Sequence, residues 1–215
     1  MADTETGKIA GFLRMMTPER PELLKRIEEE CRAEYIPLVT PETGRFLQVM
    51  VQACKPARIL EVGTGIGYSA ILLAAAGRER LQKITTIEID PIRFERARRN
   101  FHEAEIMGLV EPLLGDAAEI IPTLTAGYNF VFMDAAKGQY PDFFSKIFPL
   151  LNSGGILIID NIFLGGWVVE MTWPERRKKT MVCRVRELLE TLKDHPELAT
   201  SLIPLGDGLA VSVRR

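Results

Sequence analysis

From Arg58 onward, short apolar segments alternate with amphipathic stretches, and this alternation constrains the fold more than any other feature of the sequence. Most apolar segments lack an internal polar alternation, which favours strands covered on both faces. Stretches of helical period fill the intervals between them. The predicted strands are RILEV, KITTIEI, VEPLL, YNFVFMD and GGILIID. Strands of this kind joined through helices predict an α/β fold with a doubly wound, mostly parallel sheet.

Both ends of the chain depart from this pattern. Residues 1–56 are predicted to be helical, because Thr17-Pro18 and Thr40-Pro41 each offer a capping hydroxyl before a proline suited to a first helical turn. A further helix is predicted across about residues 175–194. After it, LATSLIPL and LAVSVRR flank Gly206-Asp207-Gly208, which predicts a C-terminal antiparallel hairpin at the sheet edge.

The length and composition bound the organisation of the chain. With 215 residues, of which 47% are hydrophobic, we expect a single domain over 1–215, made of an N-terminal helical part, 1–56, and a sheet-containing core, 57–215. The formal net charge of -2 argues neither for nor against nucleic acid as a partner. Three widely spaced cysteines favour reduced thiols in a cytoplasmic protein. The sequence shows neither an export signal nor a run of roughly 18 apolar residues, so we expect no membrane partner.

A glycine-rich turn follows the first predicted strand. In ILEVGTGIGYSA, the residues Gly63, Gly65 and Gly67 allow the backbone to turn sharply and approach a ligand at a helix N-terminus. The next strand ends in Glu88, whose carboxylate can accept hydrogen bonds from both hydroxyls of a ribose. A nucleoside ligand is therefore predicted. Two alternatives stay open: glycines that serve only the turn with Glu88 capping the next helix, and a nicotinamide dinucleotide, since Gly65-x-Gly67-x-x-Ala70 also fits that fingerprint.

Three later strands also end in acidic residues. Asp116 follows the third strand, Asp134 the fourth, and Asp160-Asn161 the fifth. Each could be a simple helix cap or turn residue. Because carboxyl ends of parallel strands share one edge of the sheet, we expect the side chains of Asp134, Asp160 and Asn161 to converge. Two carboxylates and an amide oxygen are ligands that Mg²⁺, Mn²⁺ or Ca²⁺ accepts, and hydride transfer has no need of them.

Lys137 lies three residues after Asp134, in the turn that leaves the fourth strand. A surface lysine is the commoner fate for this residue type. Next to a metal ion and partly buried, however, its neutral amine would be favoured, and it could accept a proton from a substrate hydroxyl. The two histidines, His102 and His195, have no partner pattern and are assigned no chemistry.

The sequence resembles the cation-dependent O-methyltransferases, the group that includes catechol and caffeoyl-CoA O-methyltransferases. The similarity spans nearly the whole chain from Glu22 onward, and its motifs are LEVGTGIGYSA, TTIEIDP, GDA, FMDAAKGQY, IIDN and PLGDGLAVS. The resemblance implies the class I methyltransferase fold with a Rossmann-like core, S-adenosylmethionine (SAM) as methyl donor, and a homodimer. It implies Asp134, Asp160 and Asn161 as metal ligands and Lys137, with Asp134, as catalytic residues. The cofactor contacts that it implies are Val39, Glu61, Gly63, Gly65, Ser69, Glu88, Asp116, Ala117 and Asp134.

The methyl acceptor is narrowed by one departure from the family pattern. Many small-molecule members read Asp-Ala-Asp-Lys where this chain reads Asp134-Ala135-Ala136-Lys137. The strings DAAKGQY, PERRKK and HPELATSLIPLGDGLAVS look most like a bacterial branch that methylates 5-hydroxyuridine at the tRNA wobble position. The leading hypothesis is therefore an enzyme that binds the tRNA anticodon region and forms 5-methoxyuridine. The alternatives are a small catechol or caffeoyl-CoA-like acceptor, a nicotinamide-dependent oxidoreductase and a catalytically silent SAM-binding module.

A local basic cluster adds physical support for RNA. Between Met171 and Arg186, one acid faces six basic residues, which gives a local charge of +5; they are Arg176, Arg177, Lys178, Lys179, Arg184 and Arg186. The simpler interpretation is a solvated helix face. Phosphate groups around a flipped nucleotide could instead bind here, because the positive charge is concentrated in this one segment beside the predicted active-site strand.

Overall fold

A computed structural model describes residues 2–173 and 175–215, without the side chains of residues 2–6. Within these residues seven strands form one sheet in the order β3-β2-β1-β4-β5-β7-β6. The strands are β1 (Arg58–Val62), β2 (Lys83–Glu88), β3 (Val110–Leu114), β4 (Tyr128–Met133), β5 (Leu151–Asp160), β6 (Leu198–Ile203) and β7 (Leu209–Arg214). All pairs from β3 to β5 are parallel, whereas β7 runs antiparallel to both β5 and β6. The predicted mostly parallel sheet with a C-terminal antiparallel hairpin is confirmed.

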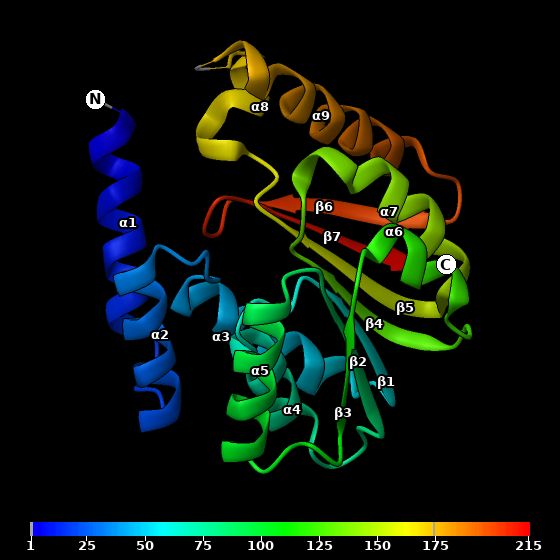
Figure 1. Cartoon of the computed structure of the whole chain (residues 1–215). Helices are drawn as coiled ribbons and strands as arrows, with labels where there is room; N and C mark the ends of the chain where they lie inside the picture. Colours follow the sequence, from blue (N-terminus) through cyan, green and yellow to red (C-terminus); the bar gives the residue numbers. More distant parts are fainter. Residues whose placement is uncertain (1, 174) are drawn as a thin grey trace.

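The helices lie on both faces of this sheet (Figure 1). They are α1 (Ala2–Met16), α2 (Glu22–Glu34), α3 (Pro41–Cys54), α4 (Tyr68–Gly77), α5 (Pro91–Glu103), α6 (Ala117–Ile120), α7 (Tyr140–Ile147), α8 (Trp167–Glu170) and α9 (Lys179–Asp194). Single 3₁₀ turns span Ile121–Thr123, Lys137–Gln139, Phe148–Leu150, Leu164–Gly166 and Arg176–Lys178.

Each central strand contributes side chains to two separate cores, because successive side chains of a strand point to opposite faces. In β4, Phe130 and Phe132 pack on the face covered by α2, α3, α4 and α5. Val131 and Met133 of the same strand pack on the other face, with α7 and α9. All four side chains are fully buried. Burial on both faces explains why the strands read as continuous apolar runs in the sequence.

The two threonine-proline pairs behave differently from each other. Thr40 caps α3 as predicted, since its hydroxyl oxygen accepts the Thr43 N–H at 3.3 Å and Pro41 starts the helix. Thr17 does not begin a helix: its hydroxyl donates to the Leu13 carbonyl at 2.9 Å, and α2 starts only after Pro21. The local sequence is a threonine followed by a proline in both cases. Thr40 stands before a helix, whereas Thr17 stands directly after one, and the local pattern does not distinguish these positions.

The last long helix begins later than the sequence predicts. A single 3₁₀ turn covers Arg176–Lys178, and α9 runs from Lys179 to Asp194, while Pro174 lies outside the described residues. The start of α9 and the short helix α8 stand above the end of β5 (Figure 1). Within the part of the chain that the structure describes, no helix is both long and apolar enough to cross a membrane.

Candidate active site

A cavity of about 350 Å³ opens at the carboxyl ends of β1, β2 and β4. This is where the strand order reverses. On one side of β1 the sheet continues through β2 to β3, and on the other side it continues through β4 to β5. Ligands of open parallel sheets bind at such a reversal. The predicted site residues that line the cavity are Val39, Gly63, Gly65, Ser69, Glu88, Asp116, Ala117, Asp134 and Lys137.

The glycine-rich turn closes one wall of the cavity through a backbone contact that only glycine allows. Gly63 has a φ of +101°, and a Cβ atom there would lie 2.1 Å from the Asp134 carbonyl oxygen. The Asp134 N–H donates to the Val62 carbonyl at 2.9 Å, which joins the ends of β1 and β4 directly. The turn therefore fixes the position of Asp134 as well as its own shape.

Glu88 lies at the end of β2 and is 5% exposed. Its Oε2 accepts the Gly65 N–H at 2.7 Å and its Oε1 accepts the Asp90 N–H at 3.0 Å. The following helix, α5, is capped by Asp90 itself, so capping does not account for Glu88. Each carboxylate oxygen can accept one further hydrogen bond, so Glu88 has two free acceptor positions, one for each of two ribose hydroxyls.

Asp116 combines the two roles that the sequence left open. Its Oδ1 accepts the Ala118 N–H at 2.8 Å and so caps the short helix α6. The same residue lines the cavity together with Ala117. A capping carboxylate at this position leaves its second oxygen available to a ligand.

Glu61 is the most deeply buried acid of the site, with no solvent exposure. Its Oε2 accepts the Thr86 hydroxyl at 2.5 Å, whereas its Oε1 has no hydrogen-bond partner among the described residues. Burial raises the pKa of Glu61 to about 7, and the nearby carboxylates of Asp134 and Glu88 add to the rise. A buried, unpartnered oxygen is costly, and a hydrogen-bond donor or a positive charge would relieve this cost, although Glu61 itself is not among the residues that line the cavity.

Asp134 follows β4 and Asp160 ends the adjacent strand β5, in matching positions, because Met133 of β4 pairs with Ile159 of β5. Lys137 Nζ donates to Asp134 Oδ1 at 2.6 Å. Asp160 is 3% exposed, and its pKa is raised to about 7 by burial and by the charge of Asp134. Asn161 has a φ of +57°, and its N–H donates to Asp160 Oδ1 at 2.6 Å. The structure thus brings Asp134, Asp160 and Lys137 together and places the Asn161 backbone beside them, although Asp160 and Asn161 do not line the cavity itself.

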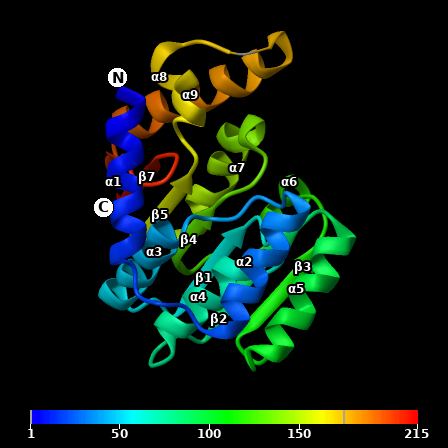
Figure 2. The same ribbon diagram turned by 90° about the vertical axis from the view of Figure 1, so that its left-hand side faces the viewer.

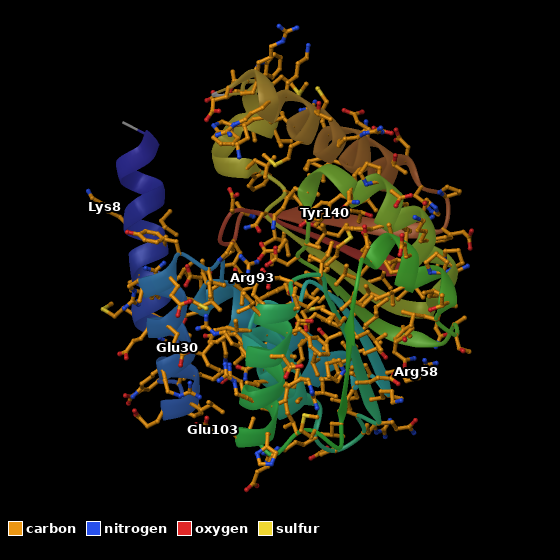
Figure 3. The ribbon with its side chains drawn as sticks, viewed as in Figure 1. Lys8, Glu30, Arg58, Arg93, Glu103 and Tyr140 are labelled. Atoms are coloured by element: carbon orange, nitrogen blue, oxygen red, sulfur yellow. The ribbon has the colours of Figure 1, made fainter. Side chains whose placement is uncertain are left out.

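Two further residues connect this acidic group to the rest of the fold. Tyr140, fully buried at the start of α7, donates its hydroxyl to the Asp160 carbonyl at 3.0 Å (Figure 3). Asp207 in the hairpin turn accepts the Gly165 N–H at 2.8 Å, and its charge acts on Asp160. Among the described residues no group of three or more His, Cys, Asp or Glu side chains is arranged to hold a metal ion. The predicted set differs in composition, since an amide accompanies its two carboxylates.

Neighbouring glutamates offset part of the positive charge of the basic segment, residues 176–186. Arg177, Arg184 and Arg186 form ion pairs with Glu175, Glu187 and Glu190, at 2.5, 2.8 and 3.0 Å. Lys179 lies over the Trp173 ring, 5.1 Å from its centroid. Arg176 and Lys178 have no carboxylate partner within the described ranges. The segment lies outside the cavity wall.

Sequence reasoning missed several residues of the cavity wall. Tyr68 adjoins the glycine turn and could have been found by adjacency. Leu38, Arg93 and Phe143 come from a loop and from the helices α5 and α7, where no local pattern distinguishes them from ordinary surface or core residues. Figure 3 shows Arg93 at the site end of α5 and Glu103 at its far end.

Comparisons with known proteins agree with this architecture. A family model described as O-methyltransferase matches residues 15–215. A relative from Mycolicibacterium vanbaalenii, provisionally named an O-methyltransferase, is 33% identical over 82% of this chain and 76% of its own length. Among solved structures, the O-methyltransferase TomG from Streptomyces achromogenes, crystallised with SAM, has a TM-score of 0.85 at 28% identity over 96% of both chains. A Staphylococcus aureus protein, provisionally named a caffeoyl-CoA O-methyltransferase, has a TM-score of 0.85 at 26% identity, over 99% of this chain and 100% of its own.

The sheet order and the position of the cavity define a class I methyltransferase fold. The chain belongs to the O-methyltransferase family. The family match favours methyl transfer over the nicotinamide-dependent alternative.

The backbone contact at Gly63 generates a first prediction. Gly63→Ala should lower the free energy of unfolding by about 3 kcal/mol or more, because the new Cβ meets the Asp134 carbonyl in a strained conformation. Gly65→Ala is the matched control: φ there is +56° and nothing lies within 4 Å of its Cβ position, so about 1 kcal/mol is expected. Urea unfolding measures both. Equal losses in the two variants would contradict the proposed role of the contact.

Proposed function

We propose that this protein transfers the methyl group of SAM to the 5-hydroxyl group of a uridine at the tRNA wobble position, with a divalent metal ion at Asp134, Asp160 and Asn161. The observation that carries the proposal is the junction of two sites at one sheet edge. A cavity lined by Glu88 and Asp116 is suited to a nucleoside, and Asp134 connects it to the acidic group that contains Asp160.

The chemistry of the cavity fits SAM. Glu88 keeps two acceptor positions for the ribose hydroxyls. The unpartnered, fully buried Oε1 of Glu61 fits the ammonium group at the amino-acid end of the cofactor. SAM supplies an activated methyl group on a positively charged sulfur. The surrounding acids Glu61, Glu88 and Asp134 favour a cation in the cavity.

The donor set at the neighbouring strand ends fits a hard divalent cation. Asp134 and Asp160 supply carboxylate oxygens from adjacent strands, and Asn161 supplies an amide oxygen. When bound, such an ion supplies Lewis acidity toward the neighbouring oxygens of an acceptor, and both 5-hydroxyuracil and catechol present such a pair. In this set Lys137 is the one cationic side chain that contacts Asp134 among the described residues.

The remaining residues position the reactants and move the proton. Lys137, whose ammonium group donates to Asp134 at 2.6 Å, acts as a base only after it has lost a proton to solvent. Its neutral amine then takes the proton of the acceptor hydroxyl, and the resulting oxygen anion attacks the methyl carbon as the sulfur leaves with the bonding electron pair. The glycine-rich turn holds the donor. Holding nucleophile and methyl group in a near-attack geometry can supply about 7 to 11 kcal/mol of the rate acceleration.

One surface feature supports RNA as the acceptor. Arg176 and Lys178, without carboxylate partners among the described residues, follow the β5 end and can contact phosphates.

A second surface supports a dimer. Helix α1 projects on one side of the molecule and exposes Ile9, Phe12, Met15 and Met16, a surface that a second copy would cover (Figure 1). The free cysteines suit the cytoplasm, where tRNA is modified. Sedimentation of the purified chain measures the assembly.

A small acceptor is the second candidate. The Staphylococcus aureus structure is provisionally named for caffeoyl-CoA, and pairing with glutamates neutralises half of the basic segment here. Fast methylation of a catechol, insensitive to salt, would favour this alternative.

The decisive experiment offers the protein, SAM and Mg²⁺ to tRNA that carries 5-hydroxyuridine and lacks its methyl group. Nucleoside mass spectrometry should show 5-methoxyuridine. The double variant Arg176→Gln/Lys178→Gln should weaken tRNA binding and reduce the slope of log affinity against log salt by about 1.5, since each phosphate contact contributes about 0.7 to 0.9. Arg80→Gln/Arg98→Gln, with the same charge change away from α8 and α9, should leave the slope unchanged. If the tRNA remains unmethylated while the same protein methylates a catechol, RNA is rejected as the acceptor.

Removal of one proposed metal ligand separates chemistry from cofactor binding. Asp160→Asn should lower turnover about 100-fold or more, because a metal ion supplies several kcal/mol of charge stabilisation. Affinity for S-adenosylhomocysteine (SAH) should stay within about threefold of the wild type, since Asp160 does not line the cavity. EDTA should abolish turnover and Mg²⁺ should restore it. Full activity of the chelated protein would eliminate the metal from the mechanism.

The buried acid Glu61 predicts that cofactor binding depends on pH. With a pKa of about 7, the Glu61 carboxyl is protonated below neutrality in the free protein, and the ammonium group that SAM and SAH share favours its ionised form. SAH affinity should therefore reach its full value about one unit above pH 7 and should fall by up to about tenfold per unit as the pH drops from 7 to 5.5. Calorimetry in buffers of different ionisation enthalpy should show proton release at pH 6.5. In Glu61→Gln the affinity should be lower and independent of pH over this range.

A further inference from the structure

A buried carboxylate in α2 takes no part in the proposed chemistry yet has partners from two other segments. The Glu28 side chain is 10% exposed. Arg20, in the segment before α2, contacts it with two nitrogens, and its Nη2 donates to Glu28 Oε2 at 2.9 Å. From the other side, the Tyr68 hydroxyl donates to Glu28 Oε1 at 2.6 Å. A charged acceptor makes these bonds strong.

Tyr68 carries this contact to the cofactor cavity. It is the first residue of α4, directly after Gly67 at the end of the glycine-rich turn, and it is 2% exposed. The residue lines the cavity, while its hydroxyl bonds to α2. Burial and the Glu28 carboxylate raise the pKa of Tyr68, so its hydroxyl remains a donor.

A second chain of hydrogen bonds runs from α2 to the same turn. Arg26 Nη2 donates to Asn100 Oδ1 at 3.2 Å, and Asn100 Nδ2 donates to the Ile66 carbonyl at 2.8 Å. Asn100 belongs to α5 and is 4% exposed. The turn is thus held from α2 at two points, Ile66 and Tyr68. Figure 2 shows α2 beside α5 and over the layer that contains α4.

The opposite wall of the cavity also depends on α2. The helix ends at Tyr35, whose φ of 55° reverses the chain, and Pro37, Leu38 and Val39 then line the cavity. Helix α2 therefore adjoins two cavity walls: it bonds to the turn on one side and leads into residues 37–39 on the other, where α3 begins at Pro41 and packs against α4.

We propose that Glu28 is a positioning residue for the cofactor, which through the Tyr68 hydroxyl holds the glycine-rich turn and residues 37–39 in the arrangement that binds SAM. The inference rests on the proposed use of SAM. Its physical basis is a population effect: if the turn leaves this arrangement, the apparent dissociation constant rises in inverse proportion to the fraction of competent protein.

Tyr68→Phe tests the contact with the smallest possible change, since only the hydroxyl is lost. We expect the dissociation constant for SAH, measured by calorimetry, to rise about five- to tenfold, the loss expected when a bond to a charged acceptor no longer restrains the turn. Amide hydrogen exchange of residues 62–69 should be faster in the free variant and should return to the wild-type rate with SAH bound.

A matched control separates positioning from general stability. Arg96 of α5 also reaches α2, pairing with Glu30 at 2.9 Å and Glu34 at 2.6 Å, but it has no contact with the turn (Figure 3 labels Glu30). Arg96→Gln should lower the melting temperature and leave SAH affinity unchanged. Glu28→Gln should weaken SAH binding as Tyr68→Phe does, and the double variant Glu28→Gln/Tyr68→Phe should lose less than the product of the two single effects.

The outcomes are distinct for this inference and for the proposed function. A wild-type protein that does not bind SAH refutes the cofactor assignment. A wild-type protein that binds SAH, together with a Tyr68→Phe variant of equal affinity and equal exchange in residues 62–69, refutes only the role of Glu28. If Arg96→Gln lowers SAH affinity as much as Tyr68→Phe does, the Glu28–Tyr68 contact contributes only to general stability, and the inference is overturned.

Discussion

The site depends on the backbone contact between Gly63 and Asp134, where the strand order reverses. At this point β1 and β4 run side by side while their connections lead to opposite faces of the sheet, which opens a crevice above their ends. The Asp134 carbonyl group occupies the space that a Cβ atom at residue 63 would need, so only glycine lets the turn and Asp134 lie this close together. A donor site on one side and a nucleophile site on the other can share a wall only because of this contact.

The second constraint on the site is an excess of buried negative charge. Glu61, Glu88 and Asp160 are each at most 5% exposed, and Asp134 lies between them. Lys137 is the cation paired with Asp134. The raised pKa values of Glu61 and Asp160 express the cost of keeping both ionised without ligands. The two ligands that we propose, a sulfonium donor and a divalent cation, would both relieve this cost.

How much the sequence predicts depends on whether the signal is local. Four of the five parallel strands were predictable to within a residue, because burial on both faces leaves an unbroken apolar run such as YNFVFM in β4, whereas β5 begins three residues before the predicted GGILIID. The residues at strand ends were predictable as well, since parallel strands bring their carboxyl ends to one edge. Thr17 was misassigned because a threonine before proline reads the same at either end of a helix. The pairing of Arg184 and Arg186 with Glu187 and Glu190 was missed because the basic segment was considered without the helical turn that follows it. Glu28 was missed because its partners lie in other elements, 8 and 40 positions away.

The Glu28 contact also shows why a buried ion pair can persist at this position. Replacing such a pair with apolar residues often leaves stability unchanged or raises it, so a stability benefit is a weak reason for its presence. An apolar contact between α2 and α4 would bury similar area but would allow the helices to slide, because apolar packing is not directional. A carboxylate that accepts from both Arg20 and Tyr68 fixes one register of α2 against the turn. Register matters to the cavity because α2 bonds to the turn through Tyr68 and leads directly into residues 37–39, which line the facing side.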